Sequence, residues 1–217
     1  MILSGKKVIM IGDSITDCER ARPIGEGKGD SSLGRGYVAQ LHAMLEATYP
    51  TLDMRMINMG IGGNTVRELK TRWQTDVIDL RPDWVSIMIG INDVARHYNR
   101  RLMKEWHVSL EEFETTLSAL VEESKAAEIQ KIVLMTPFFI ETNPNDQIRI
   151  MTLEYGAAVK RISEKHGTIY IDVQAAFDVY LKHHHPTELA ADRIHPSQTG
   201  HMIIAREWLK SVGYTWL

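Results

Sequence analysis

The chain has 217 residues, of which 44% are hydrophobic and 24% are charged, and its formal net charge is -3. This is the composition of a globular protein with enough apolar side chains for a sizeable core. The weakly acidic balance argues against general nucleic-acid binding, which usually needs a basic face. Cys18 is the only cysteine, so no intramolecular disulfide can form and nothing points to an oxidising compartment.

The sequence shows no membrane or export signal. No stretch approaches the roughly 20 apolar residues of a membrane helix. The apolar run near the N-terminus ends within about five residues, whereas a signal peptide needs roughly seven to fifteen. We therefore expect a cytoplasmic protein without a membrane partner. Repeats, low-complexity tracts and linkers are absent from the sequence, which predicts a single domain over residues 1–217.

The first predicted strand lies within residues 7–17, KVIMIGDSITD. Its continuous apolar run is typical of a strand buried on both faces, and the glycine after it indicates a sharp turn. Residues 17–36 then show no hydrophobic period but carry several glycines and four cationic side chains. A loop of this length is often functional, so we expect it to face the substrate. The Walker pattern is missing, so this is not a phosphate loop.

Helices and strands alternate along the rest of the chain. Further strands are predicted at 52–59, 84–89, 132–135 and 169–171. Helices are predicted at 37–47, 66–80, 110–127, 148–166 and 175–181, with a last helix capped by Ser197 and reaching Lys210. Ser109 is the expected cap of the third, with Glu112 as its capping-box partner. Residues 90–107 and 188–197 are predicted connections. Five alternations predict a parallel, doubly wound α/β sheet with helices on both faces.

Four of these strand ends and loops carry residues suited to acyl transfer. Ser14 follows the first strand, a glycine pair with Gly63 follows the second, Asn92 follows the third, and Asp192 and His195 lie near the C-terminus. The ends of parallel strands meet at one edge of the sheet. A nucleophilic serine needs a base, and the base needs a group that orients it. An oxyanion needs fixed donors, for which the Ser14 and Gly63 N–H groups and the Asn92 amide are candidates.

In this order, GDS, the glycine block, GxND and DxxH resemble the four blocks of the SGNH (GDSL) hydrolase family. The longer strings GDSITD, RARP, GxGGNTVR, PDWVSIMIGINDV, MTPF and HPSxxGH resemble the intracellular bacterial acetylxylan esterases, which deacetylate xylo-oligosaccharides. The resemblance implies a flavodoxin-like αβα sandwich with a five-stranded parallel sheet and no metal or other cofactor. It also implies Ser14 as nucleophile, His195 as base, Asp192 as its orienter, and an oxyanion hole of Ser14, Gly63 and Asn92.

The expected activity is therefore that of a serine carboxylesterase removing acetyl groups from xylo-oligosaccharides or similar sugars. Activity should rise through about pH 6 to 7, where an imidazole loses its proton. The main alternatives are a thioesterase or lysophospholipase on the same fold, then a non-catalytic carbohydrate-binding module, and last a flavodoxin-like phosphate-binding protein. Ala191 departs from the nearest esterases, where we expect a bulky aromatic residue.

Several of these residues also have simpler interpretations. Ser14 could be a helix N-cap, which is a common role for serine after Gly-Asp. Cys18 is close enough in sequence to be considered as a nucleophile, but no cysteine-enzyme signature surrounds it. Asp13 and Asp17 are expected to hold the loop, although either could compete to orient the base. Asp93 is likewise expected to be structural.

Two further features concern possible partners. Residues 183–185 are three consecutive histidines, whose side chains point in different directions on a helix, so a solvated helix end is expected rather than a metal site. The aromatic C-terminus, with Tyr214, Trp216 and Leu217, should not remain in water. We expect it to dock on its own domain or on another subunit. A homo-oligomer is expected, and the resemblance suggests the same.

Overall fold

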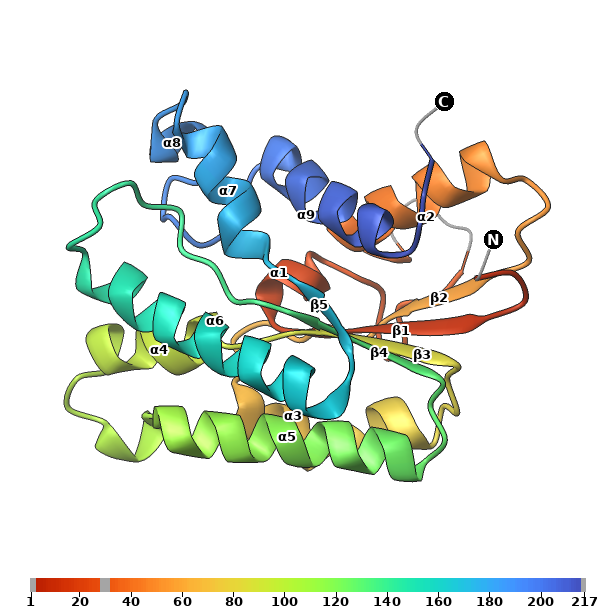
Figure 1. The fold of residues 1–217 in the computed structure, drawn as a ribbon, viewed down its shortest axis with the longest axis horizontal. Helices are drawn as coiled ribbons and strands as arrows, with labels where there is room; N and C mark the ends of the chain where they lie inside the picture. Colours follow the sequence, from red (N-terminus) through yellow and green to blue (C-terminus); the bar gives the residue numbers. More distant parts are fainter. Residues whose placement is uncertain (1–2, 28–31, 216–217) are drawn as a thin grey trace.

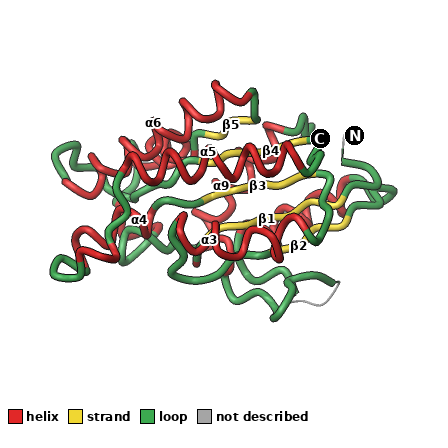
Figure 2. The backbone as a smooth tube through the Cα atoms, turned by 90° about the horizontal axis from the view of Figure 1, so that it is seen from below, coloured by secondary structure: helices red, strands yellow, loops and turns green. Residues whose placement is uncertain are grey.

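The computed structural model describes residues 3–27 and 32–215, and their centre is a five-stranded, all-parallel sheet. The strands are β1 (Lys7–Gly12), β2 (Arg55–Asn58), β3 (Trp84–Met88), β4 (Lys131–Met135) and β5 (Ile169–Ile171). They lie side by side in the order β2-β1-β3-β4-β5 (Figure 2). This order is the flavodoxin-like one. The predicted fold class is therefore confirmed.

Helices cover both faces of the sheet (Figure 1). They are α1 (Ser14–Asp17), α2 (Tyr37–Thr48), α3 (Val66–Trp73), α4 (Ile91–Asn99), α5 (Leu110–Ala126), α6 (Gln147–His166), α7 (Val173–Leu181), α8 (Pro186–Leu189) and α9 (Gln198–Ser211). In Figure 1, α2, α7, α8 and α9 lie above the sheet, and α3 to α6 lie below it. An apolar core lies between each helix layer and the sheet.

The burial of both faces of β1 explains why its sequence is continuously apolar. Val8 and Met10 belong to the core on one face, whereas Ile9 and Ile11 belong to the core on the other. Alternate side chains of a strand point to opposite faces, so a strand covered on both sides has no polar positions. Because β2 and β3 flank β1, the strand order reverses at β1. Ligands of open α/β sheets bind beyond the carboxyl ends of the strands at such a reversal.

The prediction of a helix-free connection over residues 90–107 is wrong. This segment contains α4 and a short 3-10 helix, Lys104–Trp106. Ile91, Val94 and Ala95 form the buried face of α4, at ordinary helical spacing. Asp93 is also fully buried there, and this polar residue between apolar positions hid the amphipathic pattern.

Two other elements are shorter than predicted. Strand β2 does not cover 52–59, because Leu52 and Met54 pack into the core ahead of the residues that pair with β1. The helix expected at 66–80 is α-helical only to Trp73 and continues as a π-helical turn, Gln74–Ile78. The connection expected from 188 overlaps α8, and α7 begins before the predicted position 175.

The predicted caps are confirmed only in part. Ser109 Oγ accepts a hydrogen bond from the Glu112 N–H at 3.1 Å. The Glu112 carboxylate does not complete a capping box, because it pairs with Arg67 instead. Ser197 occupies the N-cap position of α9 but makes no side-chain cap bond. The complete capping box at the start of α3 joins Thr65 and Glu68.

The C-terminal segment packs on its own chain as far as the structure describes it. The Tyr214 hydroxyl lies 2.6 Å from the Thr48 hydroxyl, and its ring meets Tyr49 edge-on at 5.7 Å between centroids. Trp216 and Leu217 lie outside the described residues. In the described ranges 3–27 and 32–215, no helix has both the length and the apolar character needed to cross a membrane.

Candidate active site

Ser14 stands at the turn between β1 and α1. Gly12 is required there, because a Cβ at this position would come 2.2 Å from a carbonyl oxygen of β3. Asp13, rather than Ser14, caps α1, with Asp13 Oδ1 accepting from the Ile15 N–H at 3.0 Å. The serine hydroxyl is therefore not used as a cap. It lies 2.8 Å from His195 Nε2.

Asp192 and His195 meet within one turn of chain. His195 Nδ1 is 2.5 Å from Asp192 Oδ2, and both side chains are about half exposed. Asp192 Oδ1 accepts from the backbone N–H groups of Ile194, at 3.0 Å, and His195, at 2.8 Å. Partial burial raises the pKa of Asp192, but the hydrogen bonds from His195 and the backbone outweigh it and leave the pKa below its ordinary value. The carboxylate therefore stays ionised at neutral pH and can hold the imidazole in one tautomer.

The three expected oxyanion donors are the N–H groups of Ser14 and Gly63 and the side-chain amide of Asn92. The Ser14 N–H belongs to the first turn of α1, where N–H groups lack intrahelical partners. Gly63 has φ +79° and open space where a Cβ would stand, and a Cβ at the preceding Gly62 would lie 3.8 Å from Ser14 Cβ. Asn92 Nδ2 donates to the Asn64 carbonyl at 3.0 Å. That bond uses one amide hydrogen, so the second can serve another acceptor.

Arg72, which the sequence did not identify, joins the ends of β1 and β2. From α3 its guanidinium donates to the carbonyls of Gly12, at 3.0 Å, and Met59, at 2.6 Å. It also donates to Asn64 Oδ1 at 2.8 Å. The only signal in the sequence was the i,i+4 spacing from Arg72 to Asp76, and that ion pair is formed at 2.8 Å. Nothing local indicates that the same guanidinium reaches two strand ends.

Helix α4 holds the same loop from the other side. Arg96 donates to the Gly63 carbonyl at 2.8 Å, a contact that the sequence did not predict either. Asp93 Oδ1 accepts from the Val66 N–H, the first residue of α3, at 3.0 Å. The loop between β2 and α3 is thus bonded to α3, to α4 and to the end of β1.

Two of the buried aspartates, Asp13 and Asp93, hold their protons more strongly than an ordinary aspartate does. Burial raises the pKa of each to about 7, although backbone hydrogen bonds, from the Ile15 and Val66 N–H groups respectively, lower it in part. The charge of His195 also lowers the pKa of Asp13. Asp13 nevertheless does not hydrogen-bond the imidazole, whose Nδ1 belongs to Asp192.

Replacing Asp93 with asparagine should flatten the pH dependence of stability. In the folded protein this carboxyl keeps its proton up to about pH 7, whereas its ordinary pKa is 3.8. Between these values the folded state binds more protons, so the contribution of Asp93 to stability falls as pH rises, by up to about 1.4 kcal/mol per pH unit. Urea unfolding of wild type and Asp93→Asn at about pH 4.5, 5.5 and 6.5 measures this difference. Parallel curves for the two proteins would show that Asp93 is ionised in the folded state throughout this window.

Cys18 lies behind the nucleophile turn beside His201. Its Sγ is 3.6 Å from His201 Nε2, while His201 Nδ1 accepts from the Tyr37 N–H at 3.2 Å. Burial lowers the pKa of His201 to about 4 and raises the pKa of the Cys18 thiol. A neutral imidazole and a protonated thiol do not form an activated cysteine nucleophile.

The consecutive histidines hold the end of α7 and the start of α8. His184 Nδ1 lies 3.0 Å from Glu188 Oε2, and His185 caps α8. In the part of the chain that the structure describes, no group of three His, Cys, Asp or Glu side chains is arranged to hold a metal ion. These histidines therefore have structural partners of their own.

Comparison with known proteins identifies the family of this chain. The model of the GDSL-like lipase/acylhydrolase family matches residues 10–203. The acetylxylan esterase of Geobacillus stearothermophilus is 54% identical over 214 residues, which cover 99% of this chain and 97% of that protein. The resemblance seen in the sequence motifs is thus confirmed over nearly the whole chain.

Solved structures agree with this assignment. The crystal structure of Axe2, an acetylxylan esterase from Geobacillus stearothermophilus, has a TM-score of 0.97 at 53% identity and covers 100% of this chain and 99% of its own. Forms of Axe2 described as catalytic mutants replace a serine, a histidine and an aspartate. LAE5, an alpha/beta hydrolase from the metagenome of Lake Arreo, has a TM-score of 0.94 at 46% identity, covering 97% of this chain and 96% of its own. The chain belongs to the GDSL-like lipase/acylhydrolase family.

Proposed function

We propose that this protein is a serine carboxylesterase that removes acetyl groups from acetylated xylo-oligosaccharides or similar sugars. The observation that carries the proposal is the hydrogen-bonded series Ser14–His195–Asp192, with distances of 2.8 and 2.5 Å, at the carboxyl edge of the sheet. The full-length similarity to an acetylxylan esterase supports the choice of substrate.

In the first half of the reaction, Ser14 Oγ attacks the acetyl carbonyl carbon while His195 Nε2 takes the hydroxyl proton. Asp192 keeps His195 Nδ1 protonated and stabilises the imidazolium. The N–H groups of Ser14 and Gly63 and the Asn92 amide stabilise the charge on the carbonyl oxygen. When the tetrahedral intermediate collapses, its bond to the sugar oxygen breaks, and the imidazolium protonates the departing sugar hydroxyl. The acetyl group remains as an ester on Ser14.

In the second half, a water molecule replaces the sugar. His195 takes one of its protons, and the resulting hydroxide attacks the acetyl-serine ester. Collapse of the second intermediate returns the proton to Ser14 Oγ and releases acetate. Each step uses the same oxyanion donors and the same base, and none consumes a cofactor.

The surroundings of the site favour a bulky, polar leaving group. The side chains of His195 and Asp192 are about half exposed, so the reacting atoms are accessible from solvent. Ala191 is exposed beside them and carries only a methyl group where the resemblance led us to expect an aromatic ring. The loop after Ser14 adds the half-exposed guanidinium of Arg22. A sugar hydroxyl with further hydroxyl groups suits this setting better than a lipid chain.

Rates of ester hydrolysis distinguish the candidate functions. Acetylated xylo-oligosaccharides, acetylated cellobiose and aryl esters of increasing acyl length would be compared, with Ser14→Ala as the blank. We expect the highest kcat/KM on acetylated xylo-oligosaccharides and a steady fall as the acyl chain lengthens. Faster turnover of long acyl esters would favour the thioesterase or lysophospholipase alternative. A binding module would give neither turnover nor labelling by a serine-reactive phosphonate.

We further propose a cytoplasmic homo-oligomer in which residues 1–217 act as one domain. The single cysteine suits a reducing compartment. Large apolar side chains are exposed on the described surface, among them Leu102 at 97% and Val179 at 62%, and subunit contacts would cover them. Light scattering coupled to size exclusion measures the subunit number, and cell fractionation tests the location.

A further inference from the structure

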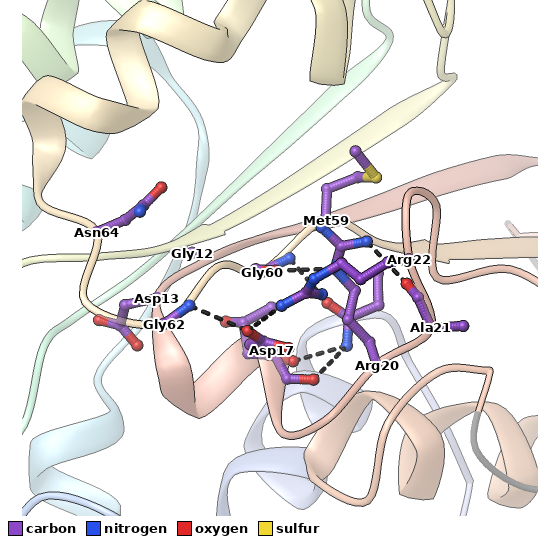
Figure 3. A network of polar contacts seen from close by, with 12 residues as sticks. Gly12, Asp13, Asp17, Arg20, Ala21, Arg22, Met59, Gly60, Gly62 and Asn64 are labelled. Carbon is purple, nitrogen blue, oxygen red and sulfur yellow. Dashed lines mark hydrogen bonds and ion pairs between the residues drawn. The ribbon is translucent and has the colours of Figure 1, made fainter.

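The turn that carries Ser14 is tied to the loop that carries Gly63 (Figure 3). Asn58 Nδ2 donates to the Thr16 carbonyl at 2.6 Å, and Arg20 Nε donates to the Gly60 carbonyl at 2.8 Å. The Gly62 N–H donates to Asp17 Oδ2 at 3.0 Å. These three bonds join residues that are 40 to 45 positions apart in the sequence.

Asp17 links the helical turn that carries Ser14 to the loop that carries Gly63. It ends α1, the single helical turn that Ser14 begins, so its carboxylate and the nucleophile share one rigid element. A Cβ at Gly62 would lie 3.8 Å from Asp17 Oδ2 and 3.8 Å from Ser14 Cβ. A side chain at position 62 would therefore touch both Ser14 and Asp17, and Gly62 itself meets the Asp17 carboxylate through its N–H (Figure 3).

The Asp17 carboxylate accepts its side-chain hydrogen bonds through one oxygen. Its Oδ2 receives both the Gly62 N–H and a guanidinium N–H of Arg22, the latter at 2.5 Å. Its other oxygen, Oδ1, is buried and has no hydrogen-bond partner among the described residues. An unmet buried acceptor lowers stability, so such a group calls for an explanation beyond stability alone.

The contacts on either side of Gly63 supply that explanation. Asp17 fixes the N–H of Gly62, and Arg96 fixes the carbonyl of Gly63. The Gly63 N–H lies between these two anchors. Gly63 has φ +79° and no Cβ, so its own backbone preferences would not hold it in one orientation. We propose that Asp17, held by Arg22, is a positioning residue that aims the Gly63 N–H at the oxyanion; this rests on the proposed esterase function.

An aimed oxyanion donor has a kinetic signature. The charge on the carbonyl oxygen develops only as the transition state forms, so a misaimed donor lowers kcat and leaves KM nearly unchanged. It also weakens binding of a boronic acid, whose tetrahedral serine adduct places an oxygen in the same hole. Removing a whole oxyanion donor costs about 100- to 1000-fold in kcat, and displacing one should cost less.

Two substitutions separate geometry from charge. Asp17→Glu keeps the charge but moves the carboxylate by one methylene, and we expect kcat on an aryl acetate to fall about 10- to 100-fold. Asp17→Asn keeps an oxygen for the Gly62 N–H and puts its NH2 where Oδ1 has no partner, so kcat should stay within about 3-fold of wild type. The loss of boronate affinity should match the loss of kcat in each variant.

Asp178→Glu is the control, since Asp178 is likewise an aspartate paired with an arginine, Arg149, at 2.9 Å, although its side chain is more exposed than that of Asp17. It should leave kcat unchanged. Arg22→Ala, at a half-exposed position, tests the support for Asp17 without a buried change and should lower kcat in the same direction as Asp17→Glu, with Arg22→Lys restoring it.

The outcomes are distinguishable. Wild-type kcat and boronate affinity in Asp17→Glu would overturn the inference, and so would an equal loss in Asp17→Asn, which would make charge rather than position the cause. A fall in Tm of Asp17→Glu would shift the decision to Arg22→Ala, where wild-type kinetics would overturn the inference. A wild-type protein that neither hydrolyses acetates nor reacts with a phosphonate at Ser14 would instead refute the proposed function.

Discussion

Replacing Ser14 with alanine is expected to lower kcat for aryl acetate hydrolysis by about 10⁴- to 10⁶-fold, the loss that follows when a catalytic triad loses its nucleophile. The change removes only the hydroxyl, which lies 2.8 Å from His195 Nε2. Asp13 still caps α1, so the turn should keep its shape. Steady-state kinetics with p-nitrophenyl acetate, together with the Tm, measures both effects. Ser211→Ala, which removes a hydroxyl that donates to the nearby Trp208 carbonyl, is a control with unchanged kcat.

The same experiment tests the identity of the nucleophile. A serine-reactive phosphonate should add its mass to the peptide that contains Ser14 in the wild-type protein and to no peptide in Ser14→Ala. Turnover at the wild-type rate in the variant would mean that another side chain forms the acyl-enzyme. Cys18 would then be examined first, although burial raises its pKa and so disfavours the thiolate.

Asp192→Asn is expected to reduce kcat by about 10³- to 10⁴-fold, a loss comparable to that seen when a triad aspartate becomes an amide. Asp192 accepts the Nδ1 proton of His195 at 2.5 Å, and its lowered pKa keeps it ionised. An amide can donate its NH2 to Nδ1, which would place the imidazole proton on Nε2. The imidazole would then face Ser14 with a donor and could not take the hydroxyl proton.

The pH dependence of kcat/KM in this variant adds a second measurement. With His195 in the wrong tautomer, the remaining activity should come from hydroxide and rise steadily at alkaline pH. A variant with nearly wild-type kcat would show that another carboxylate orients His195. Asp13 is the candidate, because its charge interacts with that of His195, and Asp13→Asn in the same background would then abolish activity.

Much of the fold could be predicted because it follows from local pattern. Apolar runs ending in glycine mark strands that are buried on both faces, and their alternation with helices requires parallel pairing. Helix α4 was missed because one position on its buried face is polar. In sequence, the buried carboxyl of Asp93 resembles a solvent-facing residue unless its partner, the Val66 N–H, is known. Boundaries such as the π-helical turn Gln74–Ile78 likewise depend on packing rather than on composition.

The features of the candidate site likewise divide into those set by local sequence and those set by packing. Asp192 and His195 are three residues apart, so one turn of chain is enough to bring carboxylate and imidazole together. The glycine at position 63 suits the local backbone, which has a positive φ there. These features, together with the order of the motifs, were determined by the sequence itself.

Only the tertiary structure decided how these pieces meet. Ser14 and His195 are 181 positions apart, and only the folded chain brings the turn after β1 together with the segment between α8 and α9. Arg72 reaches the Gly12 carbonyl across 60 positions, and Asp17 reaches the Gly62 N–H across 45. Sequence pattern reports which face of an element is buried, but the partner of a long polar side chain depends on where the neighbouring elements lie in the folded chain. The proposed nucleophile and base could therefore be selected from sequence, whereas the residues that hold the Gly63 loop in place became visible only in the folded protein.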